Sequence, residues 1–304
     1  MKMNSDRWLL RIADNDDCEI TSVGGAAFEL QDDHSTNPEI DWSRFPVKEM
    51  IKRGWITRKE AIRPELFDLV PGWDRLCPLF RRTWIRCNKQ VDSYSLAAWT
   101  ARVVLNSQQD FPKGRFHPGR IDLAVMTEIA KLSVSELGLR QVTERLSEYG
   151  VTLVVEPHLP KTYLDGAALL FPRDVAIIGL TLRHDRIDNF WYALMHELAH
   201  LALHVGKDQH AHFFDDFDAN DKIDPREMEA DELASEALIP KVAWDASPAK
   251  MLPSKEAAEL LATELDIHPA IVAGRMRHER SYKFLSSLVG NGGIRCQFPN
   301  IHWS

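Results

Sequence analysis

One segment constrains the fold of this chain more than any other, because it carries three chemically active side chains inside an apolar run. His196 and His200 are four residues apart, and Glu197 directly follows the first histidine. Apolar residues lead in over 190–195 and lead out over 201–203. Apolar positions all round a helix are typical of a buried helix. Buried imidazoles and carboxylates cost free energy unless a partner satisfies them, so the segment predicts a buried helix whose polar groups share a partner.

A metal ion is the partner that this spacing favours. Residues four apart lie one above the other, roughly 6 Å apart along a helix axis, so both imidazoles can reach one ion. Glu197 points about 100° around the helix from His196, where it can take a proton from a metal-bound water. The alternative is a surface helix that carries two histidines by coincidence. Asp185 or Asp188 is expected to cap the start of this helix.

A catalytic zinc site needs a third protein ligand and an open position for water. The acidic segment 227–238 is the best downstream source, and helical spacing separates its candidates. One stripe, which includes small residues that allow close approach to another helix, consists of Glu227, Ala230, Asp231, Ala234 and Leu238. Glu227 is the predicted ligand, and Asp231 is placed to accept the second N–H of a ligand histidine. The other interpretation is an ordinary exposed acidic helix start.

Other acidic and histidine side chains near these two segments are less well placed. Glu229, Glu232 and Glu236 fall off the stripe of Glu227. His204 lies on the face of His196 and His200, one turn further along. It is either an alternative ligand or a residue that packs or bonds nearby.

Composition bounds the class of protein. The chain has 304 residues, of which 44% are apolar and 27% charged, as in ordinary globular proteins. Its four cysteines are scattered without a CxxC pair, which argues against a disulfide framework and favours a reducing compartment. The sequence contains no signal-peptide pattern and no apolar stretch of ~20 residues. We therefore expect a cytoplasmic protein with no membrane partner.

The negative charge is concentrated directly after the histidine-bearing segment. Residues 207–236 hold 11 acidic and 3 basic side chains, a difference of −8 that equals the net charge of the whole chain. Two interpretations are open: a negative field at the mouth of the site, or a solvated acidic loop.

Hydrophobic patterning predicts an α+β fold that is mainly helical. Helices are expected over 47–55 and over 58–69, where Pro64 is expected to interrupt the helix. A further helix is expected after an N-cap at Ser93, with Leu96, Trp99 and Val103 on one face, and two more over 123–132 and 139–149. Short strands are expected over 151–155, 167–171 and 175–180, as a small sheet packed on the histidine-bearing helix. One of these strands either receives an extended peptide at its edge or only supports the helix.

The predicted organisation has four parts. They are an N-terminal extension (1–44), a helical region (45–135), the metal-bearing core (136–241) and a C-terminal helical region with a tail (242–304). In the last part, 254–265 reads as a helix whose inner face holds Ala257, Leu260, Leu261 and Leu265. A second helix from Pro269 to about Arg280 gives a helix-turn-helix-like arrangement. Its modest basic face, Arg275, Arg277, His278 and Arg280, leaves DNA binding possible, but packing on the core is the favoured role.

Taken together, the motifs resemble the ImmA/IrrE family of zinc metallo-endopeptidases. The matching stretches are 189–204, with the HExxH motif, and 227–240, with Glu-x-x-Ala-Asp-x-x-Ala followed by Leu-Ile-Pro. Residues 45–56 and 267–275 are similar to a subgroup described as HigA-type antitoxin regulators that carry this peptidase domain. The residues before Phe45 do not read as the N-terminal helix-turn-helix of that subgroup.

The resemblance implies a zincin-like core and a set of roles. Zn²⁺ would be held by His196, His200 and Glu227, with Glu197 as general base. Members of the ImmA/IrrE family cleave, or are thought to cleave, regulatory proteins, often DNA-binding repressors encoded nearby. A second oxyanion donor is usual in these sites; the candidates are Tyr163, Tyr192 and His184.

The resulting hypothesis is a cytoplasmic zinc endopeptidase that cuts a regulatory protein partner through metal-activated water. The competing hypothesis is a transcriptional regulator or antitoxin-like protein in which the zinc site is structural or sensory. Direct DNA binding would favour this alternative.

Overall fold

The structure of the protein is a computed structural model. It describes residues 40–70, 84–86, 91–110, 112–135, 137–171, 175–205, 212–215, 225–282, 285–290, 292–301 and 303. The first 39 residues of the predicted N-terminal extension lie outside these ranges, as do residues 207–211 and 216–224 of the acidic segment 207–236. Among the described residues, every helix is too short or too polar to cross a bilayer.

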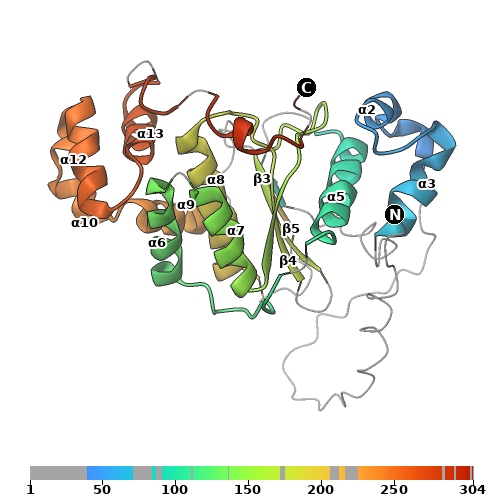
Figure 1. Cartoon of the computed structure of the whole chain (residues 1–304), viewed down its shortest axis with the longest axis horizontal. Coiled ribbons are helices and arrows are strands. Elements are labelled where there is room, and N and C mark those ends of the chain that lie inside the picture. The colour runs from blue at the N-terminus through green and yellow to red at the C-terminus, as the bar shows by residue number, and fades with distance from the viewer. Residues whose placement is uncertain are drawn as a thin grey trace, which may run out of the picture. The chain divides into compact units, whose positions relative to one another are not determined.

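A mixed sheet of five described strands, in the order β1-β5-β3-β4-β2, lies between two groups of helices (Figure 1). The strands are β1 (Trp84–Arg86), β2 (Val151–Val155), β3 (Gly166–Phe171), β4 (Val175–Leu180) and β5 (His212–Asp215). Strand β3 runs antiparallel to both of its neighbours, whereas β2 pairs with β4 and β1 with β5 in parallel. The three predicted strands are confirmed as β2, β3 and β4. Strands β1 and β5 were not predicted.

The described helices confirm the α+β prediction. They are α2 (Val47–Lys52), α3 (Ile62–Glu65), α5 (Ser93–Ser107), α6 (Leu123–Lys131), α7 (Gly138–Glu148), α8 (Ile187–Leu203), α9 (Pro225–Leu238), α10 (Lys241–Ala246), α11 (Pro248–Met251), α12 (Lys255–Leu265) and α13 (Pro269–Glu279). Short 3-10 turns are η1 (Trp42–Arg44), η2 (Lys59–Ala61), η3 (Phe67–Leu69), η5 (Leu132–Val134) and η6 (Arg295–Gln297).

Helix α5 covers one face of the sheet, and its apolar side chains pack closely there because they face a glycine of β4. Trp99 and Val103 approach β4 so closely that a Cβ at Gly179 would lie 2.8 Å from the indole ring and 3.2 Å from the valine methyl. The indole N–H also donates to the backbone carbonyl of Glu156 at 2.9 Å. These contacts confirm the predicted inner face of this helix.

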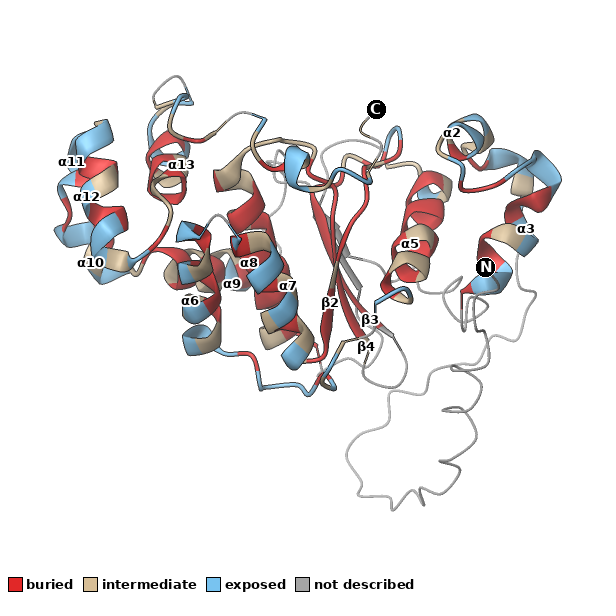
Figure 2. Ribbon diagram, viewed as in Figure 1, coloured by how far each residue is buried: buried red, intermediate tan, exposed pale blue. Residues whose placement is uncertain are grey.

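Helix α8 lies against the other face, with α7 and α9 on the same side (Figure 1). It contacts β3, β4, α9 and α13. Its central turns are buried on every side, as the all-round apolar pattern predicts (Figure 2). The segment that carries the candidate chemistry is therefore one of the most enclosed elements of the fold.

The interruption predicted at Pro64 is confirmed: the segment 58–69 is split into η2, α3 and η3, because proline has no amide hydrogen for a continuous ladder. The predicted helix caps were wrong. Asp92, rather than Ser93, caps α5 and accepts two backbone N–H bonds. Neither predicted aspartate caps α8, whose N-cap is Arg186. Asp185 instead accepts two backbone N–H bonds from the C-terminal tail.

The C-terminal helices α12 and α13 are present as predicted, but one side chain of the predicted inner face is misplaced. Ala257 and Leu261 are buried, whereas Leu260 is 60% exposed. Ala258 and Ala262 are buried in its place. Leu260 lies about 60° from Ala257 around the helix, on the side away from Ala258, so the buried face is rotated from the predicted one.

Candidate metal centre

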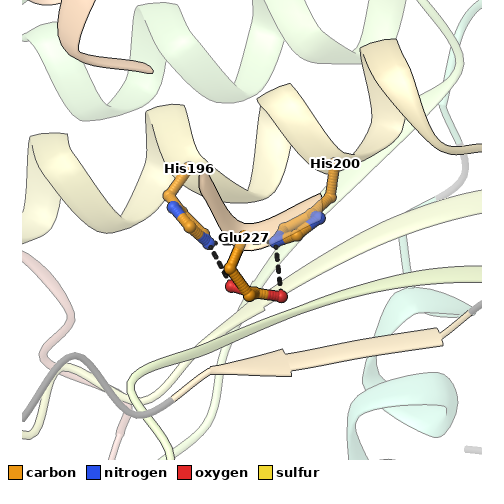
Figure 3. Close-up of side chains that lie close together, drawn as sticks. All are labelled: His196, His200 and Glu227. Carbon is orange, nitrogen blue, oxygen red and sulfur yellow. Dashed lines mark hydrogen bonds and ion pairs between the residues drawn. The ribbon is translucent and has the colours of Figure 1, made fainter. Parts of the chain in front are cut away.

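Helices α8 and α9 bring two imidazoles and one carboxylate together (Figure 3). Nε2 of His196 lies 3.2 Å from Oε2 of Glu227, and Nε2 of His200 lies 3.5 Å from Oε1 of the same carboxylate. The two Nε2 atoms are 2.9 Å apart. The structure therefore places the three residues predicted as ligands in one cluster, with all three ligand atoms within 4.8 Å of one another.

These distances fit a tetrahedral metal site. With metal–ligand bonds of 2.0–2.1 Å, two ligand atoms of a tetrahedron are roughly 3.3 Å apart. The nitrogen–nitrogen separation is 2.9 Å, and the two nitrogen–oxygen separations of 3.2 and 3.5 Å, which end on different oxygens of Glu227, are close to that value. Two imidazole nitrogens and one carboxylate are also a donor set that Zn²⁺ accepts in catalytic sites. The residues present thus suit a divalent ion of this kind.

Burial makes a cation in this place favourable. Both histidines are fully buried, and Glu227 is only 6% exposed. Metal binding requires both Nε2 atoms, which face each other at 2.9 Å, to be unprotonated, and in that state both are acceptors and cannot hydrogen-bond to each other. A cation between them and the carboxylate would satisfy all three groups at once.

Asp231, which the helical stripe of α9 predicted as the outer partner of a ligand histidine, contacts His196. Nδ1 of His196 lies 2.9 Å from Oδ1 of Asp231. The hydroxyl of Tyr192 donates to the same oxygen at 2.7 Å. Such outer partners hold a ligand imidazole in one tautomer and one orientation. Tyr192, a candidate oxyanion donor, is thus engaged on the Nδ1 side of His196 in this structure.

His204 lies directly behind His200. The Nδ1 atoms of the two rings are 3.1 Å apart, and Nε2 of His204 lies 3.1 Å from Oε2 of Glu229. Burial lowers the pKa of His204 below its ordinary value, although the neighbouring Glu229 carboxylate acts in the opposite direction. In the described part of the chain, the metal-competent group contains His200 but not His204.

Glu197 is fully buried beside the start of β3. The backbone of Gly166 approaches it so closely that a Cβ at this position would lie 2.2 Å from Oε1. No sequence pattern singled out Gly166, because its partner is 31 positions away and belongs to another element. The glycine keeps the space in which the predicted base sits.

The remaining candidate oxyanion donors lie in the loop before β3 and in the loop after β4, which meet at the same end of this antiparallel pair. Tyr163 is three residues before β3 and has a left-handed backbone, with φ of 50°. A non-glycine residue in this region costs free energy, so surrounding contacts hold it there. His184 lies between β4 and α8, where its charge helps to lower the pKa of His158, after the larger effect of burial. Their predicted catalytic role stays a prediction.

Strand β3, which passes the predicted base, has partners on both sides. It pairs with β4 on one side and with β5 on the other, where Gly166 lies opposite Asp215. In this structure β5 therefore occupies the edge of β3 to which an extended peptide would add, whereas β2 is an outer strand of the described sheet. The acidic segment is described only in part, so both interpretations of it, a negative field at the mouth of the site and a solvated acidic loop, stay predictions.

Comparison with known families supports the resemblance at the core. Residues 152–277 match the family model Peptidase M78, described as the IrrE N-terminal-like domain. The match runs from β2 into α13 and includes all three candidate ligands and Glu197. It covers less than half of the chain and does not reach residues 45–56, so the similarity to HigA-type regulators stays a prediction. Searches of curated proteins and of solved structures gave no match.

Proposed function

We propose that the chain, whose IrrE-like segment contains the cluster on α8 and α9, is a zinc-dependent endopeptidase. The observation that carries this proposal is the convergence of His196, His200 and Glu227 at distances suited to tetrahedral coordination. A divalent ion bound there would act as a Lewis acid that polarises the peptide carbonyl and lowers the pKa of a coordinated water.

The protein's own residues then have distinct roles. The two histidines and Glu227 would hold the ion, and Asp231, at Nδ1 of His196, would orient that ligand. Glu197 takes a proton from the attacking water and returns it to the leaving nitrogen as the C–N bond breaks. Gly166 allows the carboxylate to sit against β3 while it does so. Tyr163 and His184 are the proposed sources of a further donor to the developing oxyanion.

We propose a regulatory protein as substrate, for example a DNA-binding repressor encoded by a neighbouring gene. The test is incubation of the purified chain with that repressor, with and without a chelator, followed by mass spectrometry of the products. Glu197→Gln keeps the shape of the side chain but removes the base, so the variant should retain zinc and lose cleavage. Glu232→Gln, an exposed position on α9, is the matched control. Full cleavage by Glu197→Gln would contradict the assigned base.

The competing proposal, a DNA-binding regulator, has less support from α13. Arg277 is only 7% exposed. Arg275 bonds to Glu279 at 3.0 Å and lies over the ring of Trp244 at 4.5 Å. Arg280 donates to the backbone of the α11 segment. These arginines serve packing between helices, which favours the core-packing role. Band-shift assays with upstream DNA at several salt concentrations would test the point.

A further inference from the structure

A row of three polar groups leads away from the candidate metal centre. Nε2 of His200 faces the cluster, and its Nδ1 faces Nδ1 of His204 at 3.1 Å. Nε2 of His204 in turn faces Glu229 at 3.1 Å. His200 belongs to α8, His204 is its C-cap, and Glu229 belongs to α9. The row therefore joins the two helices that form the cluster.

Metal binding would determine the proton positions along this row. Nε2 of His200 must be unprotonated to bind a metal, so the ring proton would then reside on Nδ1. That N–H is fully buried and needs an acceptor. Nδ1 of His204 can accept only if the proton of His204 is on Nε2, which is the nitrogen that faces Glu229. Each donor in the row then has one acceptor.

We propose that Glu229 and His204 are a positioning pair, which acts through His200 to fix the tautomer and ring orientation that bind the metal. The inference rests on the proposed function, since it concerns a ligand of the same centre. It gives each ligand histidine its own carboxylate. Asp231 contacts His196 directly, whereas Glu229 acts on His200 through a second imidazole.

Of the roles that the sequence left open for His204, the contacts favour bonding to a neighbour over metal ligation and over simple packing. As an alternative ligand, His204 would direct a nitrogen into the cluster, but its two nitrogens face His200 and Glu229. As a simple packing residue, it would be replaceable by phenylalanine without effect on the metal. Loss of a partner behind a ligand histidine typically lowers metal affinity by about 10- to 100-fold.

The experiment measures the zinc affinity of the full-length chain by competition with a chromophoric chelator. His204→Phe keeps a ring but removes the acceptor, so its dissociation constant for zinc should rise by about 10- to 100-fold. His204→Gln restores an acceptor oxygen and should recover part of the affinity. Glu229 has a side chain that is 59% exposed, where water can replace it, so Glu229→Ala should have a smaller effect. Glu232→Ala, on the same helix, is the control.

Two further measurements separate positioning from a structural role. With His204→Phe already present, Glu229→Ala should cause no further loss, because the pair acts in series. Nitrogen NMR of the metal-free chain should show His200 protonated on Nδ1 in the wild type and a mixture of tautomers in His204→Phe. If His204→Phe does not fold, the Glu229→Ala affinity and the NMR spectrum of His204→Gln decide.

The outcomes distinguish this inference from the proposed function. If the wild type binds no zinc, the proposed centre fails, and the positioning pair fails with it. If the wild type binds zinc and folded His204→Phe binds it within about twofold of the same affinity, the positioning pair is overturned while the centre stands.

Discussion

Replacement of Gly166 by alanine would displace the proposed base without removing any ligand. The added Cβ would lie 2.2 Å from Oε1 of Glu197, 2.9 Å from its Cδ and 3.0 Å from its Cγ. Ordinary van der Waals contact begins at 3.4 Å, so the carboxylate oxygen must retreat by 3.4 − 2.2 = 1.2 Å. The three nearest atoms all belong to Glu197, which is fully buried and has little space in which to move.

The size of the effect follows from this displacement. A misplacement of about 1 Å in a reacting group can cost about 100-fold in rate, which corresponds to about 2.7 kcal/mol in the activation free energy. Overpacking of a well-packed core costs about 1–3 kcal/mol in the free energy of unfolding. We therefore expect Gly166→Ala to be folded, to bind zinc as the wild type does, and to cleave about 100-fold more slowly.

The assay compares kcat/KM for the neighbouring repressor with zinc stoichiometry in the same preparations. Gly293→Ala is the matched control, because a Cβ at that position meets no atom within 4 Å. A Gly166→Ala enzyme with undiminished cleavage would refute the proposed position of the base. A variant that loses zinc as well as activity would show that the alanine disturbs the ligands, which the contacts do not predict.

Three further perturbations test other parts of the structure. Asp231→Asn removes the carboxylate at Nδ1 of His196, so we expect about 10- to 100-fold weaker zinc binding in a chelator competition. Burial raises the pKa of Glu156 above 4.5, outweighing nearby arginines, so the stability that this group contributes is present at low pH and lost as pH rises through the raised pKa. Glu156→Gln should thus match the wild type in denaturant unfolding near pH 4 and exceed it near pH 7, and equal stability at both would contradict the shift. Prolines at Phe213 and Phe214 together remove both central amide hydrogens of β5, so the pairing with β3 should weaken and cleavage should become faster; a rate that stays the same or falls would argue that β5 does not block the edge.

The parts of the fold that depend on local pattern were predictable. Helix α8 follows from an apolar run without a polar face, and strands β2 to β4 follow from short β-rich runs. The position of Glu227 followed from a helical stripe with Ala230 and Ala234, both of which are fully buried. In each case the residue pattern within a single segment is sufficient to predict the element or the position.

The parts that were missed depend on contacts between distant segments. Strands β1 and β5 have three and four residues, too few for a periodic signal. Strand β1 pairs with β5, and β5 pairs with β3. The approach of Gly166 to Glu197 and that of Glu229 to His204 exist only once the elements pack. The spacing correctly placed Glu229 outside the stripe of Glu227. Its contact with His204 depends on how α9 is positioned along α8, which the spacing within α9 does not reveal.

The packing of α8 on α9 accounts for the whole arrangement of the centre. The rings of His196, His200 and His204 follow one another along one face of α8 and its C-cap. Helix α9 supplies three carboxylates to them: Asp231 contacts His196, Glu227 contacts both His196 and His200, and Glu229 contacts His204. Fully buried alanines on α9 allow the backbones to approach closely enough for this. The ligands and their outer partners therefore move together, and any change in the distance between the helices alters all of them at once. Because binding of an ion favours the one helix packing that presents every ligand, its free energy of binding also stabilises that packing, and removal of the ion should loosen α9 before the sheet.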